Sequence, residues 1–169
     1  MGQALPKPGL RPFLPADVPV LANIVRASIE ELTGEDYSEA QQDAWASMAE
    51  AESFGKRLAE SLTLVATMDG SPLGFITLKD NALIDLFYVH PAVAGQGVGT
   101  MLFDAIVTLA TARSATRLTA EVSDNAQPFF QKRGFQAQRR NTLTIGDEWL
   151  ANTTMDKVLA VPESGAIVS

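Results

Sequence analysis

The chain has 169 residues, of which 46% are hydrophobic and 20% charged, so it is long enough for one globular domain with its own core. Its net charge of −7 argues against a nucleic-acid partner, because binding to phosphates depends on clustered Lys and Arg. No apolar run approaches the ~20 residues of a membrane helix, and the absence of cysteine excludes disulfides, thiolate metal sites and a cysteine nucleophile. We therefore expect a cytoplasmic protein that binds no membrane, no nucleic acid and no metal.

The chain contains no internal repeat and no low-complexity linker. Its first residues, MGQALPKPGL, have neither the basic start nor the apolar centre of a signal peptide. We therefore expect a disordered leader over residues 1–9, a single domain over residues 10–160 and a tail over residues 161–169. The domain begins with a short strand over residues 10–14.

Three helices are expected after this strand. The first has Asp17 as its cap and Pro19 in its first turn. Its apolar residues at helical spacing, all on one face, are Val20, Ile24, Ala27 and Leu32. Ser38 and Gln41 form a capping box at the start of the second helix. The three helices cover residues 15–32, 37–48 and 50–60.

Three strands follow, each rich in apolar and β-branched residues and separated from the next by a short turn. Asp69-Gly70 and Asp80-Asn81 are the turn signals, since these residues tolerate the left-handed backbone that tight hairpins need. We therefore expect an antiparallel meander. Its strands are Leu62 to Met68, Leu73 to Lys79 and Ala82 to Val89.

The third of these strands runs into a glycine-rich turn, VHPAVAGQGVGTMLFDAI, with glycines at positions 95, 97 and 99. A helix with apolar residues at a spacing of 3.6 begins at Val98. A helix start carries unpaired N–H groups and a positive dipole, and glycine lets an anion come close, so the turn predicts a pyrophosphate site. The alternative is a tight strand-to-helix connection with no ligand.

Two nucleotide-binding patterns fit this turn poorly. A nucleotide P-loop needs a lysine after its last glycine, and here Thr100 follows Gly99 directly. A dinucleotide-binding turn needs G-x-G-x-x-G within a βαβ unit, whereas Gly97 and Gly99 are closer together and follow an antiparallel meander.

The rest of the chain is expected to hold a buried strand over residues 117–122, a helix over residues 125–135 and a long hairpin over residues 135–159. Gly134 ends the helix, and Gly146-Asp147 is the turn of the hairpin. The order of elements is a strand, helices, three strands, a helix, a strand, a helix and two strands. This order predicts an α/β or α+β fold with a mixed, largely antiparallel central sheet flanked by helices.

This whole order resembles the GNAT superfamily of N-acetyltransferases over residues 10–159. The segment LIDLFYVHPAVAGQGVGTMLFDAI resembles the strand, loop and helix of the family's acetyl-CoA site. The segment SDNAQPFFQKRGF resembles the family's helix along the CoA arm. The resemblance implies a cleft between two splayed strands, with the thioester of acetyl-CoA in the gap.

The resemblance also implies which residues hold acetyl-CoA. Backbone N–H groups from Gly95 to Thr100 bind the pyrophosphate, the end of the preceding strand pairs with the pantetheine, and Asn125 binds the arm from its helix start. The alternative for Asn125 is a helix cap. The full set is Phe87, Tyr88, Val89, Gly95, Gln96, Gly97, Val98, Gly99, Thr100, Asn125, Phe129 and Phe130.

Two positions depart from the family pattern. Ala94 stands where the family usually has Arg or Gln, and we expect little effect, since backbone amides carry most of the phosphate binding. Phe130 stands where many members have a tyrosine that protonates the leaving thiolate, a step that a phenyl ring cannot perform. Tyr88 and Ser123 are the candidate acids in its place, although a thiolate is a fair leaving group near neutral pH.

Transfer to an amine also needs a base, and Asp85, a carboxylate within an apolar strand, is the candidate. Strict alternation places Asp85 on the same face as Phe87 and Val89. The alternative is a paired or exposed strand aspartate. His90, the only histidine, is interpreted as a turn residue rather than a base.

The segment SIEELTGEDYSEAQQDAW lies where family members line the acceptor groove, and it is rich in acidic residues. One interpretation is an anionic pocket with aromatic walls that binds an amine. The other is an exposed acidic helix end with Tyr37 and Trp45 in the core. Trp149, on the final hairpin, either forms a further wall or packs in the core. The candidate acceptor residues are Glu31, Tyr37, Trp45 and Trp149.

Together these inferences predict an acyltransferase that moves an acetyl group from acetyl-CoA to a primary amine by direct attack in a ternary complex. The acceptor, a small molecule or a peptide, stays unidentified, and a homodimer is one open state of assembly. The alternative function is a noncatalytic acyl-CoA-binding sensor or interaction module, which the phenylalanine at position 130 keeps open.

Overall fold

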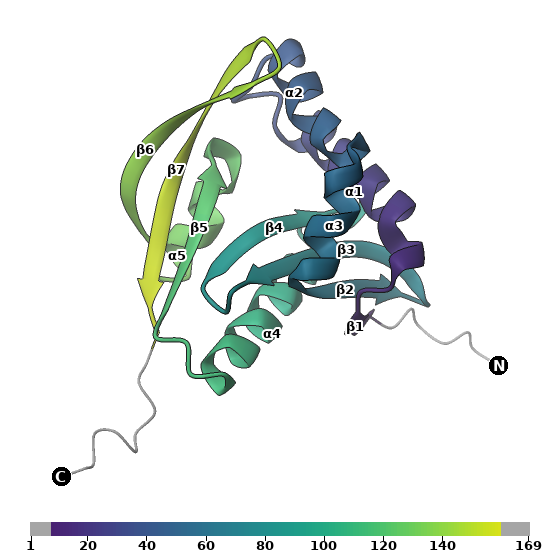
Figure 1. Ribbon diagram of the computed structural model, residues 1–169, viewed down its shortest axis with the longest axis vertical. Helices are drawn as coiled ribbons and strands as arrows, with labels where there is room; N and C mark the ends of the chain where they lie inside the picture. Colours follow the sequence, from purple (N-terminus) through teal and green to yellow (C-terminus); the bar gives the residue numbers. More distant parts are fainter. Residues whose placement is uncertain (1–7, 160–169) are drawn as a thin grey trace.

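The computed structural model describes residues 8–159, and within them the chain forms one seven-stranded sheet of order β1-β2-β3-β4-β5-β7-β6 (Figure 1). Neighbouring strands are antiparallel except for β4 and β5, which run parallel. The expected mixed, largely antiparallel sheet is therefore confirmed. The strands are β1 (Pro8–Pro12), β2 (Leu62–Met68), β3 (Ser71–Lys79), β4 (Leu83–Val89), β5 (Arg117–Ser123), β6 (Gln136–Ile145) and β7 (Glu148–Val158).

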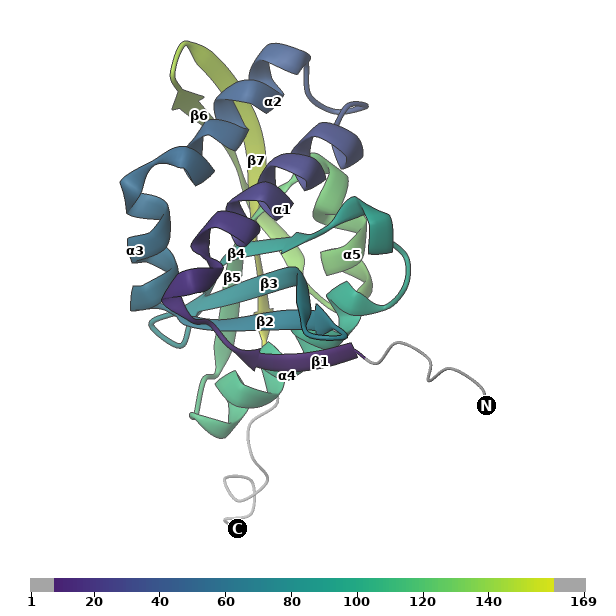
Figure 2. The same ribbon diagram turned by 90° about the vertical axis from the view of Figure 1, so that its right-hand side faces the viewer.

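Helices cover both faces of this sheet (Figures 1 and 2). They are α1 (Val18–Leu32), α2 (Glu39–Ala46), α3 (Glu52–Glu60), α4 (Val98–Ala112) and α5 (Gln127–Lys132). The α1-side core joins α1 and α3 to the sheet through residues such as Leu21, Phe54 and Phe75. The α4-side core joins α4 and α5 to the other face through residues such as Leu102 and Phe130. Within residues 8–159, none of the helices combines the length and the apolar character needed to cross a membrane.

Several local predictions are confirmed by the backbone. Asp69-Gly70 and Asp80-Asn81 form the tight turns of the meander, and all four residues have positive φ. Ser38 and Gln41 form the expected capping box at the start of α2. Gly134, with φ of 90°, follows the last turn of α5 and ends that helix as expected.

The N-terminal region differs from the prediction in three details. β1 begins at Pro8, so the sheet takes up the last two residues of the predicted leader, while the rest of the leader and the predicted tail lie outside the described residues. The side chain of Asp17 makes no cap bond to α1, because it accepts hydrogen bonds from Arg11 and from the N–H of Leu14. Leu32 is 40% exposed. The buried face of α1 consists of Leu21, Ile24, Val25, Ser28 and Ile29.

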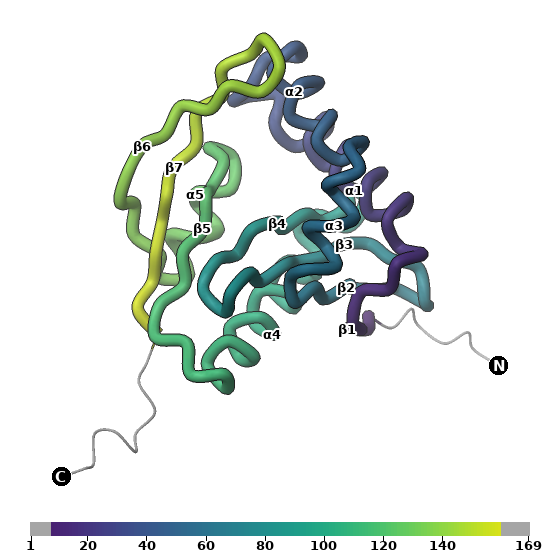
Figure 3. Tube along the Cα trace, viewed as in Figure 1, coloured from purple at the N-terminus to yellow at the C-terminus, as the bar shows by residue number. Residues whose placement is uncertain are grey.

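The sheet opens between its two parallel strands. β4 and β5 are paired only near their starts, where Leu83 faces Thr119 and Ile84 faces Ala120. Beyond this fork the two strands run apart, as the chain trace shows (Figure 3). The splayed strands expected from the family resemblance are therefore present.

β4 also contains a bulge, because its register with β3 shifts opposite Thr77. The N–H of Leu86 donates to the hydroxyl of Thr77 rather than to a backbone carbonyl. Asp85 consequently contacts a side chain of α3, whereas Phe87 packs into the α4-side core on the opposite face. The prediction that Asp85 shares a face with Phe87 and Val89 is wrong, since simple alternation does not allow for the extra residue of a bulge.

Candidate functional site

A cavity of about 1440 Å³ opens where β4 and β5 separate. Its walls come from β4 and the end of β5, the first turn of α4, α5, the end of α1 with the connection to α2, and the β6–β7 hairpin. Glu31, Gln96, Val98 and Trp149 are not among its lining residues. The candidate residues that do line it are Tyr37, Trp45, Asp85, Phe87, Tyr88, Val89, Gly95, Gly97, Gly99, Thr100, Ser123, Asn125, Phe129 and Phe130.

The turn into α4 leaves backbone donors without acceptors. Gly97 is the N-cap residue, and the N–H of Met101 donates to its carbonyl. Gln96 is also engaged, because its N–H donates to the carbonyl of Val93. Within residues 8–159, five N–H groups of this turn have no acceptor, and we name them the α4 cradle. They belong to Gly95, Gly97, Val98, Gly99 and Thr100.

Space and charge at the α4 cradle suit an anion. A Cβ atom at Gly95 or Gly97 would meet nothing within 4 Å, so the turn borders open space. The φ angles of 80° and 85° at these positions favour glycine over other residues. The dipole of the 15-residue helix α4 adds a partial positive charge at its start. The α4 cradle is therefore suited to hold a phosphate or a carboxylate.

Arg133 is a candidate ligand contact that motif reasoning missed. One of its nitrogens donates to the hydroxyl of Thr100 at 2.8 Å, and another donates to the carbonyl of Phe129 at 2.9 Å. The guanidinium carbon lies 3.4 Å from the centre of the Phe129 ring. These contacts hold a positive charge beside the α4 cradle. In the sequence, the one signal for such a contact is the basic pair Lys132 and Arg133, which follows the aromatic residues of α5.

Five phenylalanines form an apolar wall next to the α4 cradle. Their rings meet edge to face, with centroids 5.0 to 6.3 Å apart. Phe130 is 5% exposed within this group, so its position offers an apolar ring and no acidic proton. The five residues are Phe87, Phe103, Phe129, Phe130 and Phe135.

Two hydroxyl groups lie at the opening between β4 and β5. The Tyr88 hydroxyl accepts a hydrogen bond from the indole N–H of Trp45 at 2.9 Å. Burial raises the pKa of Tyr88 to about 12, so its phenol is protonated at neutral pH. Ser123 is half-buried at the end of β5 and lines the same cavity. Both hydroxyls therefore carry a proton at neutral pH and are the candidate acids of this region.

Backbone donors of β4 also point into the opening. The N–H of Leu86 donates to a side chain of β3, and the N–H of His90 donates to the carbonyl of Leu73 at the start of β3. Because successive N–H groups of a strand point to opposite edges, those of Phe87 and Val89 point toward the gap beside β5. His90 caps the next turn by accepting the N–H of Ala92, which confirms its interpretation as a turn residue.

The two carboxylates just beyond the fork have different partners. Both oxygens of Asp85 accept hydrogen bonds from Arg57 of α3, at 3.0 and 3.1 Å. Glu121 is the first residue of β5 after the last β4–β5 pair, and Asp85 has the same place on β4. The carboxylate of Glu121 accepts hydrogen bonds from the side chains of Thr154 and Asn141. Within the part of the chain that the structure describes, no arginine or lysine forms an ion pair with Glu121. Sequence reasoning identified neither Arg57 nor Glu121.

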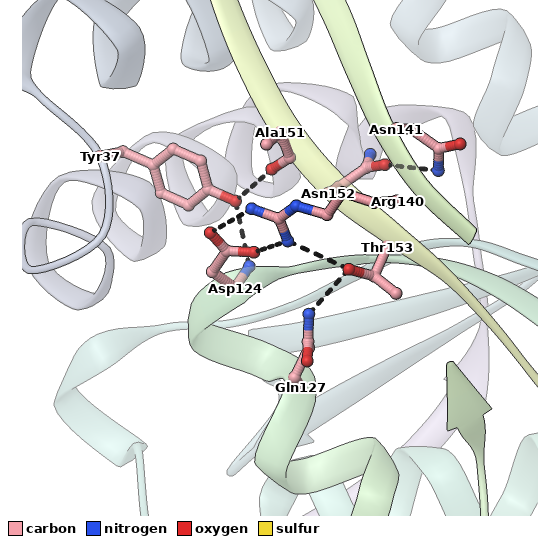
Figure 4. Close-up of polar contacts among 8 residues, drawn as sticks. All are labelled: Tyr37, Asp124, Gln127, Arg140, Asn141, Ala151, Asn152 and Thr153. Atoms are coloured by element: carbon pink, nitrogen blue, oxygen red, sulfur yellow. Dashed lines mark hydrogen bonds and ion pairs between the residues drawn. The ribbon is translucent and has the colours of Figure 1, made fainter. Parts of the chain in front are cut away.

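The acceptor candidates fall into two groups. The ring of Tyr37 is 6% exposed and meets the ring of Trp45 edge to face at 5.3 Å, and both line the cavity. The Tyr37 hydroxyl lies between Asp124 and β7 (Figure 4). Glu31 and Trp149 are exposed and lie outside the cavity lining. Trp149 is 65% exposed, so its alternative role in core packing is wrong.

Comparison with known proteins adds to this geometry. Residues 33–159 match the family model described as the acetyltransferase (GNAT) domain. The Escherichia coli (strain K12) protein YafP, described as an uncharacterized N-acetyltransferase, is 29% identical over 146 residues, covering 86% of this chain and 93% of that protein. A crystal structure of a GCN5-related N-acetyltransferase from Rhodopseudomonas palustris is 54% identical with a TM-score of 0.87, covering 94% of this chain and 100% of that one. The PaiA N-acetyltransferase of Thermoplasma acidophilum, solved with coenzyme A, is 19% identical with a TM-score of 0.76, covering 90% of this chain and 99% of that one.

Proposed function

We propose that this chain, which belongs to the GNAT family of acetyltransferases, transfers an acetyl group from acetyl-CoA to a primary amine by direct attack within a ternary complex. The observation that carries the proposal is the α4 cradle, whose unpaired N–H groups adjoin the cavity that the end of β4 lines. A pyrophosphate supplies the oxygen acceptors that these donors lack. PaiA, a relative in fold, was solved with coenzyme A, which supports the same ligand here.

In this proposal the donor lies along the fork of the sheet. The pyrophosphate binds the α4 cradle, and the guanidinium of Arg133 adds a positive charge beside it. The pantetheine arm passes between β4 and α5, where the N–H groups of Phe87 and Val89 point into the gap and the phenylalanine wall excludes water. Asn125, at the turn before α5, binds the arm from the other side.

The chemical step forms a bond from the amine nitrogen to the thioester carbon and breaks the bond from that carbon to sulfur. The N–H of Val89 donates to the carbonyl oxygen as its negative charge develops. Asp85 takes the proton that the amine loses, directly or through one water molecule. Tyr88 or Ser123 returns a proton to the thiolate, because Phe130 has none to give.

A pair of substitutions at Gly97 tests the donor site. Gly97→Gln and Gly97→Glu strain the same left-handed backbone and add nearly the same volume, but only glutamate brings a negative charge to the α4 cradle. We expect CoA, titrated by calorimetry, to bind at least about tenfold more weakly to Gly97→Glu than to Gly97→Gln, which corresponds to about 1.4 kcal/mol of repulsion. Equal affinities for the two variants would remove the α4 cradle from the site.

The competing function is a noncatalytic acyl-CoA sensor, and the buried phenyl ring at position 130 is the observation that favours it. The release of free thiol from acetyl-CoA separates the two functions. With a panel of amines at about pH 7 to 9, amine-dependent release supports the transferase. Tight binding of acetyl-CoA without thiol release for any amine supports the sensor.

The remaining parts of the proposal concern partners and location. The acceptor is a small-molecule or peptide amine, since the cavity adjoins the acidic connection between α1 and α2. The net charge of −7 disfavours nucleic acid as the acceptor. We expect a cytoplasmic enzyme, and sedimentation of the purified protein distinguishes a monomer from a homodimer.

A further inference from the structure

The hydroxyl of Tyr37 connects the two sides of the cavity. The acceptor side is lined by the connection between α1 and α2, and the donor side is lined by the start of α5. Tyr37 lies between α1 and α2, and its hydroxyl donates to the backbone carbonyl of Ala151 in β7 at 2.8 Å. The same hydroxyl accepts the backbone N–H of Asp124 at 3.0 Å (Figure 4). A phenol has one proton to donate and lone pairs to accept, so both bonds exist together.

Asp124 begins a short turn, Asp124–Ala126, between β5 and α5, which we name the Asp124 turn. Its carboxylate accepts hydrogen bonds from two nitrogens of Arg140 in β6, at 2.5 and 3.0 Å. Arg140 also donates to the hydroxyl of Thr153, which accepts a further bond from Gln127 at the start of α5. Both the backbone and the side chain of Asp124 are therefore held by residues outside the turn (Figure 4).

The Asp124 turn carries Asn125 and leads directly into α5, so its position sets the donor-side wall of the cavity. On the acceptor side, the ring of Tyr37 contacts Trp45, whose indole N–H donates to Tyr88 in β4. A continuous set of contacts thus runs from β4 through α2 and Tyr37 to the start of α5.

The chemistry of this hydroxyl favours a structural contact over a substrate contact. Its proton is directed at the carbonyl of Ala151 and is not available to an acceptor molecule. Burial raises the pKa of Tyr37, so the hydroxyl keeps the proton that it donates. The ring still lines the cavity, so a direct role of Tyr37 toward an acceptor is a contact with its ring.

We propose that Tyr37 is a positioning residue for the donor site: its hydroxyl fixes the Asp124 turn, so that Asn125 and the start of α5 meet the CoA arm. This inference rests on the proposed function, because it takes the CoA arm to lie along α5. Tyr37 then links the two sides of the cavity, because a residue of the acceptor side influences the affinity for CoA on the donor side.

Tyr37→Phe tests this role, because it keeps the ring contact with Trp45 and removes only the hydroxyl. We expect CoA to bind about three- to tenfold more weakly in calorimetry, in line with the loss of one or two hydrogen bonds. We also expect the amide hydrogen of Asp124 to exchange with solvent faster by at least about the same factor. The matched control is Thr63→Val, which removes a buried hydrogen bond to the carbonyl of Leu58 in a part of the fold that does not line the cavity.

Weaker CoA binding and faster exchange at Asp124 in Tyr37→Phe, with both properties unchanged in Thr63→Val, support the proposal. An unchanged affinity for CoA in Tyr37→Phe would overturn it, as would an equal loss of affinity in both variants, since the hydroxyl then serves stability alone. Failure of the proposed function gives different results. If the wild-type protein itself binds no CoA, both proposals fall. If it binds CoA but releases no thiol with any amine, only the transfer reaction falls, and the role of Tyr37 in CoA binding is still tested by the two variants.

Discussion

Tyr37 and Tyr88 are the only two tyrosines of the chain, and burial raises the pKa of both, that of Tyr88 to about 12. We therefore expect the folded protein at pH ~10 to show less than half of its full phenolate absorbance, because an unperturbed phenol is half ionised there. The same titration in denaturing urea should show both phenols ionising near pH ~10. Half-maximal phenolate absorbance at pH ~10 in the folded protein would contradict this account of their burial.

The raised pKa of Tyr88 also has a consequence for stability. The folded state holds this proton more tightly than the unfolded state. The protonated phenol therefore adds to the free energy of unfolding below about pH 10, and this stabilisation is lost as the pH rises toward about 12. Tyr88→Phe has no such proton to lose. The free energy of unfolding of this variant should fall less steeply over that range of pH than that of the wild type.

Asp85 is the proposed base, and a matched pair of variants tests it. Asp85→Asn keeps the shape of the side chain and removes the carboxylate, whereas Arg57→Gln breaks the same ion pair and keeps the carboxylate. We expect kcat to fall about 100-fold or more in Asp85→Asn, with the loss of the limb of the pH–rate profile that reports the base. Arg57→Gln should keep that limb. An unchanged profile in Asp85→Asn would show that another group takes the proton.

Elements with regular apolar spacing were predictable from the sequence. The meander, α4 and the last hairpin have the expected order, because their periodic residues and turn glycines act on the backbone locally. The bulge in β4 was not predictable, since the hydroxyl of Thr77 on a neighbouring strand takes the place of a backbone partner. A two-residue period consequently assigned Asp85 to the wrong face of the sheet.

The candidate site shows the same division between local and tertiary causes. The α4 cradle follows from glycines that are close together in the sequence and from a helix start, and both are visible in one segment. Arg57, Glu121 and Arg133 reach the cavity only through the packing of elements far apart in the chain. Two large apolar residues also differ from the prediction. Leu32, assigned to the apolar face of α1, is 40% exposed, and Trp149, assigned to the groove wall or to the core, is 65% exposed and does not line the cavity.

The junction between β1 and α1 depends on one buried carboxylate. Asp17 accepts two hydrogen bonds from Arg11 and one from the N–H of Leu14, each at 2.8 Å. The bonds from Arg11 lower the pKa of Asp17, so folding favours its ionised form. Asp17→Asn should therefore lower the free energy of unfolding by about 1–3 kcal/mol at neutral pH. The difference between variant and wild type should shrink as the pH falls below about 4, because protonation removes the same interaction from the wild type.

Denaturant unfolding at several pH values checks this prediction. Lys56→Gln is the control, since it removes an exposed ion pair with Glu60 in α3, and it should change stability little at any pH. A loss in Asp17→Asn that stays constant from neutral to acid pH would mean that the charge of Asp17 is not what stabilises the junction.

At the scale of the whole molecule, the sheet consists of two parts that meet at a fork. β1 to β4 and β5 to β7 are joined by the short parallel pairing of β4 with β5, and the hydroxyl of Tyr37 adds a second link on the far side of the cavity. In the proposed function, a donor molecule in the opening touches both parts of the sheet. The proposed function therefore brings the start of α4 and the end of β4 to one ligand.

A crystal structure with bound acetyl-CoA tests this account most directly. We predict that the pyrophosphate oxygens lie about 3 Å from the N–H nitrogens of the α4 cradle, and that the thioester lies in the gap beside Val89 with its carbonyl oxygen toward that residue's N–H. A pyrophosphate bound elsewhere on the protein, or an α4 cradle whose N–H groups are all occupied by the protein's own carbonyls, would contradict it.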